Sequence, residues 1–167
     1  GKSVIGMVRG LTHAGMLGSR AVYLVSTKML QEQVKEAFPR LRGDRLVHIS
    51  GQNNYDCRLL PGASVDEGPC HVGAQCRFRG SGCYYYDILG QVTEECKDRS
   101  YPVVLSNYAY YLHQKRYGGS LAVVKKDGMP MYPAFTLHIC DEAHLLNDEL
   151  GKFYTIRVSR EDVRALD

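Results

Sequence analysis

Two short segments at opposite ends of the sequence contain residues that bind phosphate and magnesium in proteins. Gly1-Lys2-Ser3 has the residue order of the second half of a phosphate-binding loop, and apolar residues at a helical spacing follow it. In such a loop, N–H groups at the helix start hold phosphate oxygens, the lysine reaches the outer phosphates and the hydroxyl binds Mg²⁺. The tripeptide alone is a weak signal, because it also occurs often by chance.

The second segment is an apolar run at residues 135–140 that ends in two carboxylates. The run predicts a buried strand, and open α/β sheets bind ligands outside the carboxyl ends of their strands. There, Asp141 would hold Mg²⁺ and Glu142 would polarise the water that attacks a terminal phosphate. A solvated acidic turn is the alternative, which the combination with Lys2 and Ser3 disfavours. The sequence therefore predicts that the two segments meet at one edge of a sheet.

Five of the six cysteines lie within forty residues, in a stretch without hydrophobic periodicity: Cys57, Cys70, Cys76, Cys83 and Cys96. No secretion signal opens the chain, so a metal or cluster site is favoured over a disulfide framework. By spacing alone, four thiolates suit an iron–sulfur cluster and a tetrahedral zinc ion equally, with His71 as a substitute zinc ligand. The stretch has too few apolar residues for a core of its own, which disfavours unrelated buried cysteines.

The elements that must position these residues alternate between strand and helix patterns. Short apolar, β-branched runs predict strands at residues 21–25, 46–49, 102–105 and 135–140. Helical spacing and capping residues predict helices at residues 3–15, 28–38, 84–97 and 107–116, one beginning within 142–150 and one at 159. A turn at Asp127-Gly128 predicts a hairpin or loop. This alternation predicts an α/β fold with a mostly parallel sheet.

The bulk composition restricts the function class only weakly. The 167 residues are 44% hydrophobic and 23% charged, as in an ordinary globular domain. The net charge of +3 permits a nucleic-acid partner without indicating one. Because no apolar run approaches the roughly 20 residues of a membrane helix, we expect no membrane partner.

Several segments resemble motifs of one protein family. Asp141-Glu142-Ala143-His144 spells the DEAH box of superfamily 2 helicases. STKMLQEQ at 26–33 resembles motif Ia of the XPD/DinG branch, and NYDC at 54–57 and SNYAYYL at 106–112 resemble further motifs of that branch. CYYY at 83–86 resembles another, with tyrosine where the family has proline. Together with GKS, these motifs occur in the family's order from residue 1 to 144.

This resemblance to XPD/DinG-like iron–sulfur DNA helicases implies a RecA-like P-loop domain in three parts. Residues 1–49 would hold the truncated phosphate loop and motif Ia, 50–83 a loop-rich iron–sulfur insert, and 84–167 the rest of the domain with the DEAH box. The resemblance implies a 4Fe–4S cluster on Cys57, Cys70, Cys76 and Cys83. Cys96 would be structural or replace a middle ligand.

The resemblance also implies ATP and Mg²⁺ as cofactors. The nucleotide-binding residues would be Gly1, Lys2, Ser3, Asp141 and His144. Lys2, Asp141 and Glu142 would be catalytic, and Ser3 and Asp141 would bind magnesium. His144 would couple this site to a second RecA-like domain of the same longer chain.

In the full protein, ATP hydrolysis would drive translocation along single-stranded DNA, in the 5′-to-3′ direction, and unwinding at duplex junctions. The residues expected to contact DNA are Ser26, Thr27, Tyr55, Arg58 and Tyr108, the two tyrosines by stacking on bases. The expected location is the cytoplasm or nucleoid for a bacterial or phage protein, and the nucleus for a eukaryotic one.

The first strand and glycines of the phosphate loop would precede residue 1, so we expect a fragment that alone hydrolyses ATP negligibly. Two alternatives remain open on the residues themselves. One is a P-loop ATPase with a zinc-binding insert, and the other is a nucleic-acid-binding module without ATPase activity. Metal analysis and DNA-stimulated ATP hydrolysis distinguish the three.

Overall fold

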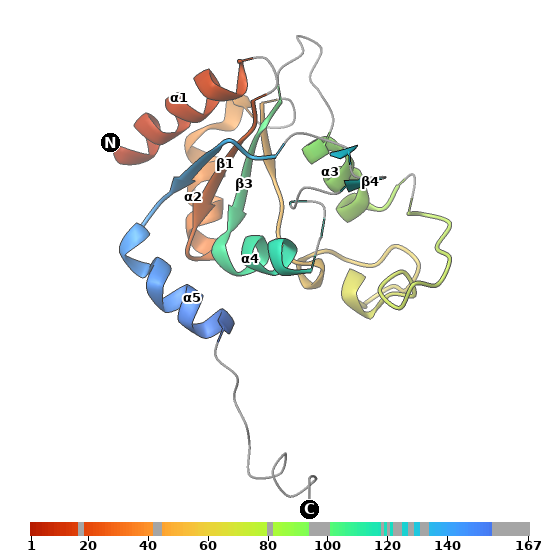
Figure 1. Cartoon of the computed structure of the whole chain (residues 1–167). Coiled ribbons are helices and arrows are strands. Elements are labelled where there is room, and N and C mark those ends of the chain that lie inside the picture. Colours follow the sequence, from red (N-terminus) through yellow and green to blue (C-terminus); the bar gives the residue numbers. More distant parts are fainter. Residues whose placement is uncertain are drawn as a thin grey trace, which may run out of the picture.

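The centre of the fold is a four-stranded sheet whose strands all run parallel (Figure 1). In spatial order the strands are β2 (Leu46–His48), β3 (Val103–Asn107), β1 (Ala21–Val25) and β6 (Leu137–Cys140). The computed structural model describes residues 1–16, 19–41, 45–79, 82–93, 101–117, 119, 121, 125–126, 129–130 and 134–154. The predicted α/β class with a parallel sheet is confirmed.

Helices cover both faces of this sheet. They are α1 (Lys2–Ala14) and α2 (Lys28–Ala37) on one face and α3 (Tyr84–Thr93) and α4 (Tyr108–Arg116) on the other, whereas α5 (Leu146–Tyr154) packs against α4. Two of them begin at side-chain caps: Thr27 Oγ1 accepts from Leu30 N–H at 3.2 Å, and the Asn107 side chain accepts from Tyr110 N–H at 2.8 Å. Such caps stabilise a helix by about 1 kcal/mol. The predicted helices are confirmed within the described residues; α3 was predicted to reach residue 97, and 94–100 lie outside them.

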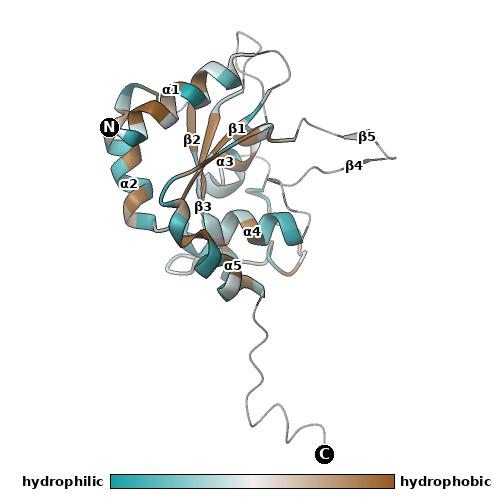
Figure 2. Ribbon diagram, turned by 60° about the vertical axis from the view of Figure 1, so that its left-hand side comes forward, coloured by the Kyte–Doolittle hydropathy of each residue, from teal (hydrophilic) through white to brown (hydrophobic). Residues whose placement is uncertain are grey.

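Neighbouring strand residues point to opposite faces, so the sheet has two cores. On one face Val22 and Val104 pack with α3 and α4, and on the other Tyr23 and Leu105 pack with α1 and α2. β1 and β3 are buried along their whole length, as expected for parallel strands covered on both sides. Figure 2 shows these apolar strands between the helices.

Two glycines allow α1 to lie very close to the sheet. A Cβ atom on Gly6 would lie 3.0 Å from the Tyr23 ring and 3.1 Å from Ile139 Cγ2. A Cβ atom on Gly10 would lie 3.0 Å from Ile139 Cδ1. Since larger side chains would push the helix away, these glycines determine how near the start of α1 comes to the end of β6.

Residues 49–79 and 82–83, between β2 and α3, contain two short 3₁₀ helices, η2 (Gln52–Asn54) and η3 (Val65–Glu67), and a single bridge from Asp56 to Ser64. Val65, Cys70 and Cys83 are buried, and they join the core on the α3 and α4 face. The prediction that this segment offers no place to bury cysteines is therefore wrong. The segment packs on the apolar face of the sheet, so its cysteines are buried although the segment itself has few apolar residues.

The remaining elements are minor. β4 (Lys125–Lys126) and β5 (Met129–Pro130) pair antiparallel, which confirms the predicted hairpin, although its turn at 127–128 lies outside the described residues. Cys96 and the helix predicted at residue 159 also lie outside them. Within the described part, none of the helices has the length and apolar character needed to cross a membrane.

Candidate functional site

Lys2 and Asp141 line the same cavity at the carboxyl edge of the sheet. The cavity has a volume of about 270 Å³ and is formed by the start of α1, Tyr23 and residues 139–144. Lys2 is the first residue of α1, and Asp141 directly follows the last residue of β6. The two segments from opposite ends of the sequence thus meet, as predicted, because Gly6 lets α1 lie against Ile139.

Tyr23 connects Ser3 with Asp141 across this cavity. Its hydroxyl donates a hydrogen bond to Asp141 Oδ2 at 3.0 Å. Burial raises the pKa of Tyr23 to about 12; the Asp141 carboxylate acts in the same direction, whereas a hydrogen bond with Ser3 opposes it. The phenol therefore stays protonated at neutral pH and serves as a donor to the carboxylate. The predicted magnesium ligands, Ser3 and Asp141, therefore both lie near the Tyr23 hydroxyl group.

The backbone of Asp141 is fixed from two sides. Its N–H donates to the Leu24 carbonyl at 2.8 Å, which continues the pairing of β6 with β1. Its carbonyl accepts from the Tyr108 hydroxyl at 2.8 Å. Burial raises the pKa of Tyr108 above its ordinary value, so this phenol is also a permanent donor. The position of the carboxylate is consequently determined by β1 and by the first residue of α4.

Glu142 makes the turn that follows. Its backbone φ of 53° is in the left-handed region, which costs a non-glycine residue about 1 kcal/mol. The turn is held by hydrogen bonds from Glu142 N–H to Asp141 Oδ1 at 3.1 Å and from Leu145 N–H to the Glu142 carbonyl at 2.9 Å. Its exposed carboxylate lies 3.3 Å from His144 Nδ1. The turn thus places two carboxylates side by side and open to water.

This arrangement suits a phosphate group with a divalent cation. The N–H groups of Lys2 and Ser3, the first two residues of α1, have no acceptor within the helix, and Lys2 lines the cavity. Carboxylate and hydroxyl oxygens, here from Asp141 and Ser3, are ligands that Mg²⁺ accepts. Glu142 is free of the Tyr23 and Tyr108 contacts that hold its neighbour, so it can act on a water molecule.

The cysteines of the insert lie partly together. Cys57, Cys70 and Cys83 are buried, Cys76 is half-buried, and all four thiols are free. A Cβ atom on Gly68 would lie 3.0 Å from Cys57 Sγ and 3.7 Å from Cys70 Sγ, so both sulfur atoms lie near one point. Among the described residues, however, no three His, Cys, Asp or Glu side chains are gathered as a metal site.

The donor set nevertheless fits a thiolate-bound group in its chemistry. Besides the free thiols, burial and then the neighbouring Cys70 raise the pKa of Tyr86 to about 12, so a protonated phenol lies near Cys70. Hydrogen bonds to sulfur are one way in which proteins tune iron–sulfur clusters. Cys76 lies at the rim of a cavity of about 530 Å³ in the 73–79 loop. For all four thiolates to bind one cluster, Cys76 and Cys83 would have to move closer to Cys57 and Cys70. His71, the alternative zinc ligand, is exposed, and its Nδ1 lies 3.1 Å from Gln52 Oε1.

The residues predicted to contact DNA separate into two groups. Ser26, Thr27 and Arg58 are at least partly exposed, although Thr27 uses its hydroxyl to cap α2. Tyr55 and Tyr108 are only 8% and 0% exposed, so neither ring can stack on a base in this structure. The prediction of stacking by these two tyrosines is therefore corrected: both are core residues whose hydroxyl groups bond to backbone atoms, at Ser50 and Asp141.

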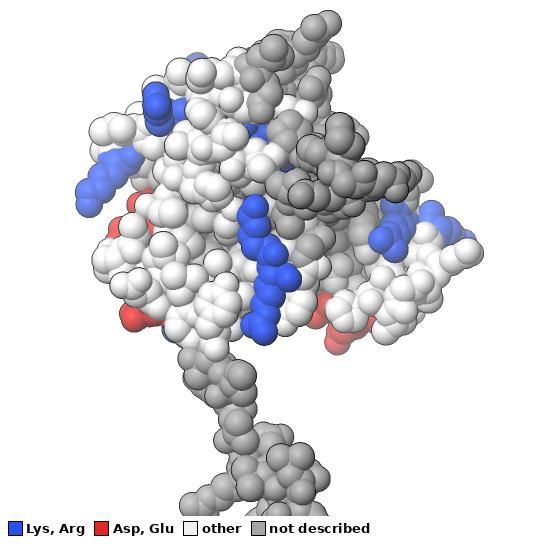
Figure 3. All heavy atoms as spheres, viewed as in Figure 1, with Lys and Arg blue, Asp and Glu red and all other residues white. Residues whose placement is uncertain are grey.

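On the face shown in Figure 3, basic side chains lie at the centre, over α4, and at the right, over the insert, and others lie at the upper left. In the insert, the guanidinium carbons of Arg58 and Arg77 each lie 4.8 Å from the centre of the Phe78 ring, and that of Arg79 lies 5.0 Å from the Tyr86 ring. These cation–π contacts hold the arginines without neutralising them. Their charge is suited to nucleic-acid phosphates.

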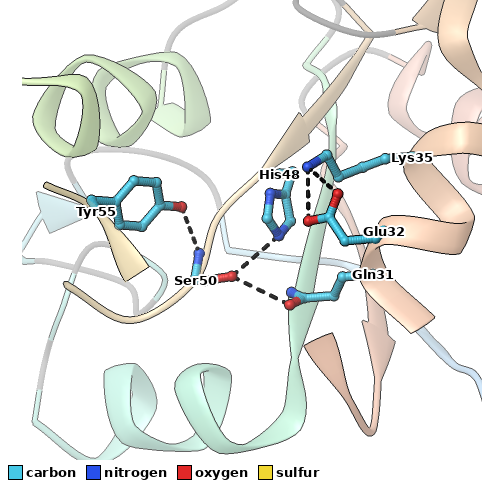
Figure 4. A network of polar contacts seen from close by, with 6 residues as sticks. All are labelled: Gln31, Glu32, Lys35, His48, Ser50 and Tyr55. Atoms are coloured by element: carbon cyan, nitrogen blue, oxygen red, sulfur yellow. Dashed lines mark hydrogen bonds and ion pairs between the residues drawn. The ribbon is translucent and has the colours of Figure 1, made fainter. Parts of the chain in front are cut away.

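Sequence reasoning missed a polar network beside this site (Figure 4). The Ser50 hydroxyl donates to Gln31 Oε1 at 3.3 Å and lies 3.1 Å from His48 Nε2. The Ser50 N–H donates to the Tyr55 hydroxyl at 2.9 Å. The available signal was the spacing of His48 and Ser50, because residues two apart on an extended chain point to the same side. The network joins α2, the end of β2 and the insert.

The network makes folding stability depend on pH through His48. Burial, and secondarily the charge of Lys35, lowers the pKa of His48 from 6.5 to about 4, while Glu32 opposes the shift. Between these values the unfolded chain binds a proton that the folded chain does not, so stability falls as pH falls through this window. The expected loss from His48 between pH 7 and pH 5 is about 2 kcal/mol.

We predict that His48→Gln removes this part of the pH dependence. The free energy of unfolding is measured with urea at pH 7 and at pH 5. Its decrease from pH 7 to pH 5 should be about 2 kcal/mol smaller in His48→Gln than in the wild type. His144→Gln is the matched control, because the imidazole of His144 is exposed, and it should keep the wild-type dependence. If His48→Gln and the wild type have the same pH dependence, the pKa of His48 is the same in the folded and the unfolded chain, and the prediction is wrong.

Comparisons with protein-family models, curated proteins and solved structures return no match to this chain.

Proposed function

We propose that this chain forms part of the first motor domain of an ATP-dependent DNA helicase of the XPD/DinG kind, with an iron–sulfur insert. The observation that carries the proposal is the common cavity of Lys2 and Asp141 at the carboxyl edge of a parallel sheet. The DEAH order at 141–144 and the family-like motifs between the two segments support it. The four-stranded sheet, covered by helices on both faces, is compatible with a RecA-like P-loop domain.

In this proposal the residues in and beside the cavity have roles that their surroundings permit. Gly1 and the start of α1 bind phosphate oxygens through N–H groups, and Lys2 binds the outer phosphates and stabilises their charge in the transition state. Ser3 and Asp141 would hold Mg²⁺, which when bound would neutralise phosphate charge. Glu142 orients the attacking water and accepts its proton.

Tyr23 and Tyr108 act as positioning residues for this chemistry. Tyr23 holds one carboxylate oxygen of Asp141, and Tyr108 holds its carbonyl. The other carboxylate oxygen, Oδ1, accepts from the Glu142 N–H, so the orientation of Asp141 does not depend on a ligand. His144, next to Glu142, couples the cavity to a second RecA-like domain of the longer chain.

The cysteine insert has a structural role in this proposal. Cys57, Cys70, Cys76 and Cys83 would hold a 4Fe–4S cluster, whose ligation cross-links a segment that has little regular structure. The approach of Cys57 and Cys70 beside Gly68 is the observation in favour of this assignment. The insert thereby acquires a fixed shape beside the arginines that would contact DNA.

DNA would follow the carboxyl edge of the sheet toward the insert. Ser26 and Thr27 lie at the end of β1, and Arg58 lies in the insert, so all three can bond to backbone phosphates. Single-stranded DNA and duplex junctions are the proposed nucleic-acid partners, and ATP hydrolysis would move the domain along the single strand.

The test is ATP hydrolysis by the longer protein that contains this chain. We expect Mg²⁺-dependent turnover that rises when single-stranded DNA is added, and negligible turnover by the 167-residue chain alone. A nucleic-acid-binding module would bind the same DNA without turnover. Turnover that is unaffected by DNA, or measurable turnover by the isolated chain, would contradict the proposal.

A further inference from the structure

A second cavity at the carboxyl edge of the sheet has the features of a binding site for one nucleotide. It has a volume of about 460 Å³ and lies between α2, the end of β2, the first turn of the insert and Tyr84. A volume of this size is ordinary for a small-molecule site. It is separate from the cavity of Lys2 and Asp141, with which it shares no lining residue.

The wall of this cavity contains an unpaired donor. Gln31 is 1% exposed, and its Nε2 atom has no hydrogen-bond partner among the described residues. Its Oε1 atom accepts from Ser50 Oγ at 3.3 Å and from Asn107 Nδ2 at 3.4 Å, which determines that the nitrogen is the unpaired atom. Leaving a buried donor without a partner costs free energy. This cost favours a small rotation of the carboxamide toward an acceptor that enters the cavity.

The other side of the cavity presents an aromatic ring. Tyr84 is 69% exposed, and its ring centre lies 5.8 Å from that of the buried Tyr55, at a tilt of 56°. Tyr84 is the first residue of α3, so its backbone is held although its side chain is open to solvent. Bases of single-stranded nucleic acids stack on aromatic rings of this kind.

The charges of the cavity are distributed so that a phosphate can bind at one end. Lys28 is the first residue of α2, where the N–H groups at the helix start also favour an anion. Of the two carboxylates, Glu32 is held by Lys35 at 2.7 Å, and Asp56 lies on the insert side. His48 is neutral at pH 7, so it neither repels nor attracts the phosphate.

We propose that this cavity takes up one nucleotide of the bound strand, with its base stacked on Tyr84, an acceptor on the base edge bonded to Gln31, and its phosphate near Lys28. This inference rests on the proposed function, because it identifies how the DNA strand is held. A free nucleoside monophosphate carries the same base and phosphate groups, and the experiment includes it as a separate probe.

The test uses the ¹⁵N-labelled 167-residue chain and three probes: an oligothymidylate of eight nucleotides, an abasic strand with the same number of phosphates, and thymidine monophosphate. The side-chain amide signals of Gln31 should shift with the oligothymidylate and not with the abasic strand. A shift with the monophosphate as well would show that the base and one phosphate suffice. A shift with the oligothymidylate alone would assign the site to a strand.

Tyr84→Ala should weaken oligothymidylate binding about tenfold and leave binding of the abasic strand unchanged. Gln31→Glu keeps the oxygen that serves Ser50 and Asn107, replaces the donor and should also weaken oligothymidylate binding about tenfold. Tyr154→Ala is the control, because Tyr154 is 64% exposed and lies on α5, and it should bind all three probes as the wild type does. Since Tyr84 is exposed, its substitution remains informative even if Gln31→Glu folds poorly.

Equal binding of the oligothymidylate and the abasic strand, or unchanged binding by Tyr84→Ala, would overturn the inference. These outcomes are distinct from a failure of the proposed function. A helicase without this nucleotide site would still hydrolyse ATP in response to DNA. Conversely, base-dependent binding without DNA-stimulated turnover would leave the nucleotide site in place and remove the motor.

Discussion

In the proposed helicase, replacing Glu142 by glutamine should lower DNA-stimulated ATP turnover by about 10²- to 10⁴-fold, which is the usual contribution of a positioned general base. The amide keeps the size of the side chain but cannot accept the proton of the attacking water. ATP binding should change by no more than about twofold, because Lys2, Ser3 and Asp141 remain in place. Steady-state hydrolysis and nucleotide binding, measured on the same preparation, separate the two effects.

Glu36→Gln is the matched control for this substitution. Glu36 is an exposed carboxylate on α2, and it should leave turnover unchanged. Equal turnover of Glu142→Gln and Glu36→Gln would mean that Glu142 is only a solvated turn residue. The left-handed backbone of Glu142 would then be an ordinary feature of the turn after β6.

Replacing Cys70 by serine should abolish bound iron and the brown colour that a cluster gives, with absorption at about 400 nm. Cys70 is the best single test among the four cysteines, because it is buried and lies beside Cys57 at Gly68. When the free concentration of a bound group is 100 times its dissociation constant, loss of that group lowers the free energy of unfolding by about 3 kcal/mol. For a chain of this size, that corresponds to a fall in Tm of roughly 6–12 °C.

The control is Cys140→Ala, because Cys140 is in β6 rather than in the insert. Iron content and absorption should match the wild type in that variant. Metal analysis of the wild-type protein also distinguishes the alternatives: zinc without iron would indicate a tetrahedral zinc site instead of a cluster. Absence of both metals, with a Tm unaffected by Cys70→Ser, would mean that the cysteines are simply buried core residues.

The fold could be predicted from local patterns because its elements follow local rules. The run at β1 is apolar and β-branched and is bounded by polar residues, and it forms the strand at the predicted residues. Thr27 and Asn107 are good helix caps, and both cap a helix. The proximity of Lys2 and Asp141 could also be predicted, because the carboxyl ends of parallel strands lie at one edge of the sheet.

The environment of single side chains could not be predicted in the same way. Tyrosine has an apolar ring and a polar tip, so the sequence does not distinguish a stacking surface from a core position. Tyr55 and Tyr108 are core residues because Ser50 N–H and the Asp141 carbonyl supply partners for their hydroxyl groups. Tyr84, next to a cysteine in the sequence, is the exposed ring.

The second cavity depends on contacts between segments that lie far apart in the chain. Gln31 is on α2, Ser50 follows β2 and Asn107 ends β3, and only the strand order β2-β3-β1 brings them together. The sequence predicted the strands but not their order. The cysteines illustrate the same limit, because their burial depends on the sheet face that the insert covers.

The cavity between α1 and β6 can be tested directly as a site for a divalent cation with phosphate. Mn²⁺ replaces Mg²⁺ at oxygen ligands and broadens nearby NMR signals, so the ¹⁵N-labelled chain can be titrated with Mn²⁺ and ATP. We predict that the amide signals of residues 2–6 and 139–144 broaden most, that Asp141→Asn reduces this broadening, and that the exposed control Asp148→Asn does not. Strongest broadening in another part of the chain, or broadening that Asp141→Asn leaves unchanged, would contradict a magnesium–phosphate site at Lys2 and Asp141.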